Sequence, residues 1–174
     1  MLFDNWRYLD PGDLDSDHAA RRPDPGFVLN APALRAATVL LAGPNFGCGS
    51  SREHAVWALR DYGFKAVIAP GFGDIFWQNC ALNGVAPVVL AESDTRQLFT
   101  LAQAGVLVVD IDLHAGTVRA GPHLFSFQLT PRQRLLLTQD IDWIGATLAH
   151  RDRIAGFEAA RLARQPWLDR MFPH

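Results

Sequence analysis

The chain has 174 residues, 49% hydrophobic and 20% charged, a balance that predicts one globular domain with a core of its own. The net charge is −2 and the sixteen cationic residues are scattered, so the sequence does not indicate a nucleic-acid partner. No apolar run reaches the roughly 18 residues of a membrane-spanning helix, and Met1–Asp10 lacks the basic-then-apolar order of a signal peptide. We therefore expect a cytoplasmic protein with no membrane partner.

Residues 1–32 hold four prolines and a patch of aspartates (Asp13, Asp15 and Asp17), which predicts an irregular, solvated loop region. Three apolar runs then predict buried strands, at 37–43, 65–70 and 86–91. Helical patterns follow each run, at 55–62, 74–84 and 93–105. Gly63 is expected to close the first helix and Ser93 to cap the third. Alternating strands and helices imply right-handed crossovers and a largely parallel sheet.

The pattern changes after Gly105. Short strands in hairpins are predicted over 106–113, 118–120 and 123–129, followed by a helix with Thr130 as its cap and Pro131 in its first position. The tail from Asp140 is predicted to be helical. The whole chain is thus expected to be one α/β domain, 1–174, with a mostly parallel central sheet, flanking helices and an antiparallel hairpin addition.

The stretch GPNFGCGSSREHA, Gly43–Ala55, concentrates glycines and reactive side chains between the first strand and the first helix. A phosphate-binding P-loop is excluded because the stretch has no lysine. A dinucleotide fingerprint fails because Arg52 stands at its third glycine position. A nucleophile elbow fails because Ser50 and Ser51 are followed by Arg52 and Glu53 instead of the required glycine.

Two interpretations of this turn remain open. Ser50 and Glu53 have the spacing of a capping box, with Ser50 or Gly49 at the N-cap, which would be a purely structural role. Alternatively, the free amides of the helix start and the Arg52 guanidinium form a site for a carboxylate, which the glycines allow to approach closely. A serine in such a site would lose its proton more easily than usual, because amides and an arginine stabilise the alkoxide.

The two cysteines, Cys48 and Cys80, are expected to be reduced and separately buried. Two thiols are also too few to hold an iron–sulfur cluster, which usually takes four thiolates. We therefore expect no metal and no cofactor on this chain.

Residues 40–90, from LLAGPNFGCGSSREHA to APVVL, closely resemble the 3-isopropylmalate dehydratase small-subunit family of the aconitase superfamily. The similarity extends upstream through LFDNWRYLD and PDPGFVLNAP and, more weakly, downstream to about Ala160. The G-x-G-S-S-R-E-H core is the most specific part. The resemblance implies the aconitase-type swivelling β/β/α domain and a hydro-lyase that interconverts 2-isopropylmalate and 3-isopropylmalate by dehydration and rehydration, in leucine biosynthesis.

The resemblance also implies roles for residues of the motif. Ser50 would be the base that removes the proton next to a carboxylate, and the substrate would be bound by Ser51, Arg52, Gly49 and Asn45. Glu53 and His54 would assist these groups without binding the substrate themselves, although His54 is as well explained by packing beneath the helix. The [4Fe-4S] cluster would sit on a separate large subunit, the expected partner, so that activity requires both chains.

Some positions depart from the family pattern. The usual N-terminal strand with N-V-D-T-D and the following I-I-P helix are not found. Gly71 and Gly73 replace the usual serine and alanine, which predicts a looser turn. Two alternatives therefore stay open: a related hydratase for another hydroxy-acid, such as methylmalate, dimethylmalate or homoaconitate, or a non-catalytic partner of the large subunit.

Overall fold

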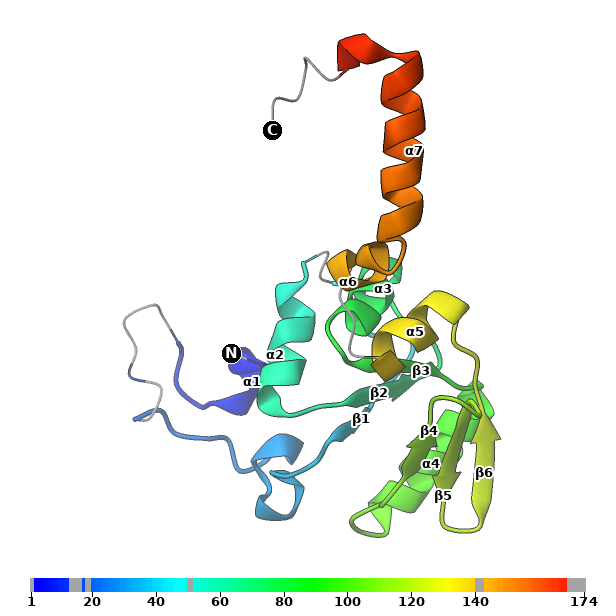
Figure 1. Cartoon of the computed structure of the whole chain (residues 1–174). Helices are drawn as coiled ribbons and strands as arrows, with labels where there is room; N and C mark the ends of the chain where they lie inside the picture. The colour runs from blue at the N-terminus through cyan, green and yellow to red at the C-terminus, as the bar shows by residue number, and fades with distance from the viewer. Residues whose placement is uncertain (1, 13–16, 18–19, 50–51, 140–142, 169–174) are drawn as a thin grey trace. The chain divides into compact units, whose positions relative to one another are not determined.

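The computed structural model describes residues 2–12, 17, 20–49, 52–139 and 143–168 (Figure 1). The chain divides into two compact units, residues 1–140 and 141–174. Residues 13–16, which include two of the aspartates of the predicted acidic patch, lie outside the described residues. A single domain spanning 1–174 stays a prediction.

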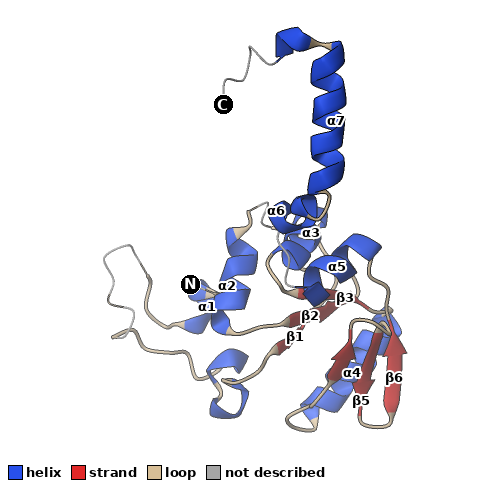
Figure 2. Cartoon of the chain, in the orientation of Figure 1, coloured by secondary structure: helices blue, strands red, loops and turns tan. Residues whose placement is uncertain are grey.

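A parallel sheet lies at the centre of the first unit. Its strands β1 (Val39–Leu41), β2 (Ala66–Ala69) and β3 (Ala86–Val89) pair in parallel in that order (Figure 2). Helix α2 (His54–Tyr62) connects β1 to β2, and helix α3 (Asp74–Leu82) connects β2 to β3. The alternation of strands and helices expected from the sequence is confirmed.

Strand β2 is buried on both of its faces, which explains why its sequence is apolar without alternation. Ala66 and Ile68 belong to a core cluster that includes Leu98 of helix α4 (Glu92–Gln103). Val67 and Ala69 belong to a second cluster, on the other face of the strand. The second cluster holds buried side chains of α2 and α3: Val56, Leu59, Phe76 and Cys80.

Strands β4 (Asp110–Asp112), β5 (Thr117–Ala120) and β6 (His123–Ser126) form an antiparallel sheet of their own, in that order. The predicted antiparallel part is therefore a complete three-stranded sheet. Its buried side chains, such as Val118 and Phe125, pack into the same cluster as Ile68. Apolar burial between two sheets and a helix thus holds this unit together.

Helix α5 (Pro131–Gln139) begins as predicted. The Gln133 amide donates to Thr130 Oγ1 at 3.2 Å, and the Thr130 amide donates to Gln133 Oε1 at 3.0 Å, a reciprocal capping box. The predicted cap of α4 is wrong, because Ala91 occupies the N-cap and Ser93 lies inside the helix. The Thr95 amide already donates to Ala91 O at 3.0 Å, and Ser93 Oγ donates to Asp94 instead.

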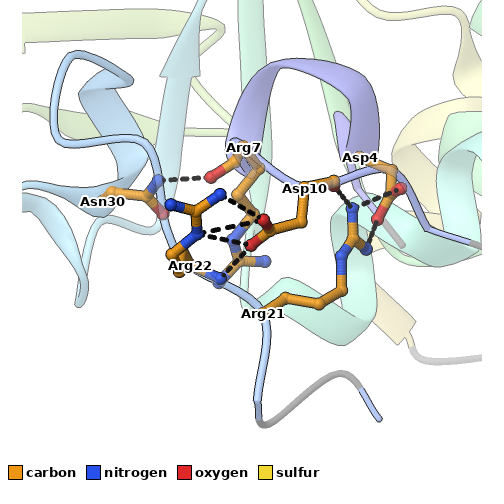
Figure 3. A network of polar contacts seen from close by, with 6 residues as sticks. All are labelled: Asp4, Arg7, Asp10, Arg21, Arg22 and Asn30. Carbon is orange, nitrogen blue, oxygen red and sulfur yellow. Dashed lines mark hydrogen bonds and ion pairs between the residues drawn. The ribbon is translucent and has the colours of Figure 1, made fainter. Parts of the chain in front are cut away.

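The described part of the N-terminal region contains short helical turns beside irregular chain, and that it is a solvated loop throughout stays a prediction. It contains helix α1 (Asp4–Arg7) and the 3-10 turns η1 (Val28–Asn30) and η2 (Pro32–Leu34). The Arg21 side chain is only 5% exposed and pairs with both carboxylate oxygens of Asp4, at 2.7 and 3.1 Å (Figure 3).

Asp10 also links distant parts of the N-terminal region, through hydrogen bonds with Arg21 and Arg22. Its carbonyl accepts from Arg21 Nη2 at 2.7 Å, and its carboxylate accepts from the amide and the guanidinium of Arg22 (Figure 3). These partners are eleven to seventeen residues apart, so no local sequence pattern could reveal them. Tyr62 Oη donates to Leu29 O at 2.9 Å and so links the region to α2.

The second unit is helical, as the sequence predicts. It consists of α6 (Trp143–Leu148), α7 (Arg151–Arg164) and the turn η3 (Pro166–Leu168). Among the helices described, none combines the length and the apolar character needed to cross a lipid bilayer.

Candidate functional site

The turns that follow β1 and β2 lie side by side at the carboxyl edge of the parallel sheet. Phe46 and Phe72 form a parallel bridge between them. The Phe46 amide donates to Gly71 O at 3.1 Å, and the Gly73 amide donates to Phe46 O at 2.9 Å. Ligands of open α/β sheets bind at this edge, so the position of the Gly43–Ala55 stretch suits a binding site.

Glycine is required at two places where these turns meet α3. Gly47 has a φ of +78°, and a Cβ built on it would lie 2.6 Å from the Phe76 Cβ. A Cβ on Gly73 would lie 2.9 Å from the Cys48 Cα and 3.1 Å from Gly47 O. The prediction that Gly73 loosens the turn is therefore wrong, because the missing side chain lets the two backbones pack closely.

Helix α2 begins later than the capping-box interpretation requires. Its first residue is His54 and its N-cap is Glu53, which has helical φ and ψ of −61° and −27° and makes no side-chain cap. The predicted N-cap at Ser50 or Gly49 is therefore wrong; Ser50 and Ser51 themselves lie outside the described residues. In the first turn, Glu53 O accepts from the Trp57 amide at 3.1 Å, the bond spacing of an α-helix, and also from the Val56 amide at 2.9 Å.

The carboxylate of Glu53 has a tertiary partner in place of the helix amides. Its Oε1 accepts a hydrogen bond from Asn83 Nδ2 at 2.8 Å. Asn83 Oδ1 accepts from Trp57 Nε1, also at 2.8 Å. The sequence around Asn83 gives no signal of this role, because Asn-Gly after an apolar helix is typical of an ordinary helix end.

The described residues of the predicted site share one property, which is exposure to solvent: Asn45, Gly49, Arg52, Glu53 and His54. Asn45 adopts the left-handed conformation, with a φ of +55°, and its carbonyl accepts from the Cys48 amide at 3.1 Å. Asparagine tolerates this conformation better than most residues. A guanidinium at the start of a nine-residue helix combines a positive side chain with the positive end of the helix dipole. Such an arrangement can bind a carboxylate.

His54 does not pack beneath its helix. Its ring is exposed and lies 4.6 Å from the Trp57 ring, centroid to centroid. It borders a cavity of about 820 Å³ between α2 and the N-terminal region, where Arg7 and Arg35 also line the wall. Of the predicted site residues that the structure describes, His54 alone reaches this cavity.

The two cysteines differ in their surroundings. Cys80 is fully buried in the core, as predicted, and burial raises the pKa of its thiol to about 12. Cys48 is exposed, so the prediction of its burial is wrong: its contact with Gly73 is made through its backbone. One exposed and one inert thiol do not fit an iron–sulfur cluster. Within the described part of the chain, no three His, Cys, Asp or Glu side chains gather to hold a metal ion.

Comparison with known proteins decides the family. Residues 1–93 match the aconitase C-terminal domain, and residues 144–170 match the C-terminal domain of the 3-isopropylmalate dehydratase small subunit. The 3-isopropylmalate dehydratase small subunit of Methylibium petroleiphilum is 50% identical over 170 residues, with 96% of this chain and 78% of that protein covered. The chain belongs to the 3-isopropylmalate dehydratase small-subunit family.

The crystal structure of 3-isopropylmalate dehydratase from Methanocaldococcus jannaschii has the same fold, with a TM-score of 0.52 and 29% sequence identity. The similarity covers 69% of this chain and 68% of that one. The resemblance read from the G-x-G-S-S-R-E-H motif and the aconitase-type α/β fold class are thus confirmed. A related hydratase for another hydroxy-acid is not favoured, since the matches name 3-isopropylmalate dehydratase.

Proposed function

We propose that this small subunit, together with a large subunit, interconverts 2-isopropylmalate and 3-isopropylmalate by dehydration and rehydration, as a cytoplasmic step of leucine biosynthesis. The observation that carries the proposal is the 50% identity to a 3-isopropylmalate dehydratase small subunit along a chain that contains the whole G-S-S-R motif. The place of the motif at the carboxyl edge of the sheet supports it. We expect no nucleic-acid or membrane partner.

In the proposed reaction, the motif handles a proton and a carboxylate. Ser50, as its alkoxide, takes the proton from the carbon next to a carboxylate, and the hydroxyl leaves from the neighbouring carbon to give the alkene. Water then adds back with the proton and the hydroxyl exchanged between the two carbons. Nearby amides and the Arg52 charge would lower the pKa of a serine hydroxyl enough for this role.

Arg52 and Ser51 would hold a carboxylate of the substrate, with Gly49 and Asn45 beside it. A guanidinium binds a carboxylate through two parallel hydrogen bonds and therefore fixes its plane as well as its position. The Lewis acid for the departing hydroxyl would come from a [4Fe-4S] cluster, which we expect on the large subunit. This chain would position the acidic carbon against the base and exclude water from the proton transfer.

The test is reconstitution of the two subunits followed by a hydratase assay on a panel of 2-hydroxy diacids. The complex should act on 2-isopropylmalate, and the small subunit alone should not. Ser50→Ala should lower kcat by about 10²–10⁴-fold, which is the usual effect of losing a general base. Arg52→Lys should raise KM, because the charge remains and the planar fork is lost. A complex that is fully active with Ser50→Ala would favour a non-catalytic partner of the large subunit.

A further inference from the structure

The side chain of Asn83 joins the end of α3 to the start of α2 through three hydrogen bonds. Oδ1 accepts from Trp57 Nε1 at 2.8 Å, while Nδ2 donates to Glu53 Oε1 at 2.8 Å and to Asn79 O at 2.9 Å. The chemistry of these partners fixes which way the amide points. An indole can only donate and a carboxylate can only accept, so a flipped Asn83 would lose both bonds.

Both partners on α2 lie on one face of that helix. Glu53 and Trp57 are four residues apart, which places them one turn above each other. Glu53 is the N-cap and follows Arg52 directly in the chain. Asn83 therefore links the first turn of α2, which Arg52 precedes, to the end of α3.

The start of the motif, at Phe46 and Gly47, contacts helix α3 and the turn that precedes α3. The Phe46 amide and carbonyl are hydrogen-bonded to Gly71 and Gly73, and Gly47 lies against the Phe76 ring. Phe76 belongs to the first turn of α3, and Asn83 follows its last turn. Residues at the two ends of α3 thus contact Gly47 on one side of the motif and Glu53 on the other.

We infer that Asn83 is a positioning residue for Arg52: by binding Glu53 and Trp57 it holds the helix start beside which Arg52 is to bind the substrate carboxylate. This inference rests on the proposed function of the motif. Misplacement of a reacting group by about 1 Å can cost on the order of 10²-fold in rate, even when the substituted residue is far from the chemistry. Asn83 acts through Glu53 and touches no substrate itself.

The test exchanges the hydrogen-bonding roles of the Asn83 and Glu53 side chains in the reconstituted complex. Asn83→Asp keeps an acceptor for Trp57 but sets two carboxylates against each other, and we expect kcat to fall roughly tenfold to a hundredfold. Adding Glu53→Gln returns a donor to that pair, so the double variant should recover most of the lost kcat. Gln78→Glu makes the same amide-to-carboxylate change at an exposed position of α3 and is the matched control, with unchanged kcat.

Activities are compared per assembled complex, so that poorer folding or assembly does not count as a loss of kcat. Wild-type kcat in Asn83→Asp, or a double variant no more active than Asn83→Asp, overturns the inference. If Asn83→Asp fails to assemble, Trp57→Phe decides, because it removes only the indole N–H; lowered kcat supports the inference and unchanged kcat overturns it. Ser50→Ala in the same series separates the two proposals, since full activity there would refute the catalytic role of the motif whatever Asn83 does.

Discussion

Gly47→Ala should destabilise the small subunit strongly, because two independent costs meet at this position. The backbone has a φ of +78°, which L residues rarely adopt, and the new methyl group would overlap the Phe76 side chain. Phe76 is 2% exposed and its ring packs edge-to-face on Phe46, with 5.4 Å between the centroids. The ring therefore has no empty space into which it can move.

The two costs can be estimated separately. A left-handed conformation costs an L residue roughly 1–2 kcal/mol relative to glycine. Forcing an extra carbon into a packed core typically costs about 1–3 kcal/mol. The free energy of unfolding should thus fall by about 2–5 kcal/mol, a large part of the 5–15 kcal/mol typical of a domain.

Urea unfolding of the isolated subunit measures this difference, with Gly49→Ala as the matched control in the same turn. Among the described residues, no atom beyond the chain neighbours lies within 4 Å of a Cβ built on Gly49, so that variant should lose less than about 1 kcal/mol. Its activity in the complex should nevertheless fall, because the methyl group would occupy space that we assign to the substrate. Equal unfolding midpoints for Gly47→Ala and wild type would refute the packing argument.

Two further predictions concern groups away from the motif. With a thiol reagent at pH 8, Cys48 should react in the folded chain and Cys80 only after denaturation, because Cys80 is buried and its pKa is about 12; equal rates for both thiols would contradict this. The pKa of Asp112 is lowered, chiefly because the Ala115 amide donates to its carboxylate and also because the His114 amide does so. A lowered folded-state pKa stabilises the protein above the unfolded value of 3.8 and loses this effect as the pH falls through the folded value. Asp112→Asn should therefore flatten the decline of the urea midpoint below about pH 4, and an unchanged decline would count against the assignment.

Sequence patterns predicted the elements whose cause is local. The run at β2 is apolar throughout because both faces of the strand are covered, and Gly63 ends α2 with a φ of +116°, as a C-cap glycine should. The Arg21–Asp4 pair was missed because its partners lie seventeen residues apart and only the fold brings them together. The close approach of the Cys48 backbone to Gly73 was missed for the same reason, since Gly73 lies in a later part of the chain.

The starts of helices α5 and α2 show how a tertiary contact can override a local rule. Thr130 caps its helix as predicted and forms a capping box with Gln133, and Pro131 occupies the first helical position. At the candidate site Glu53 is itself the N-cap, and its carboxylate is bound by Asn83. Local rules that fail in this way are expected where a segment serves a function.

Because the N-cap of α2 is Glu53, Ser50→Ala should affect activity and stability differently. A serine that caps a helix contributes about 1 kcal/mol to stability, and its loss would lower activity only through folding. Since α2 is capped at Glu53, removal of the hydroxyl at position 50 should leave the urea midpoint of the isolated chain unchanged. The loss of kcat in the complex should then appear with no loss of stability. Asp caps helices as well as serine does. If Ser50→Ala lowers both kcat and stability, and Ser50→Asp restores both, the motif has a structural role.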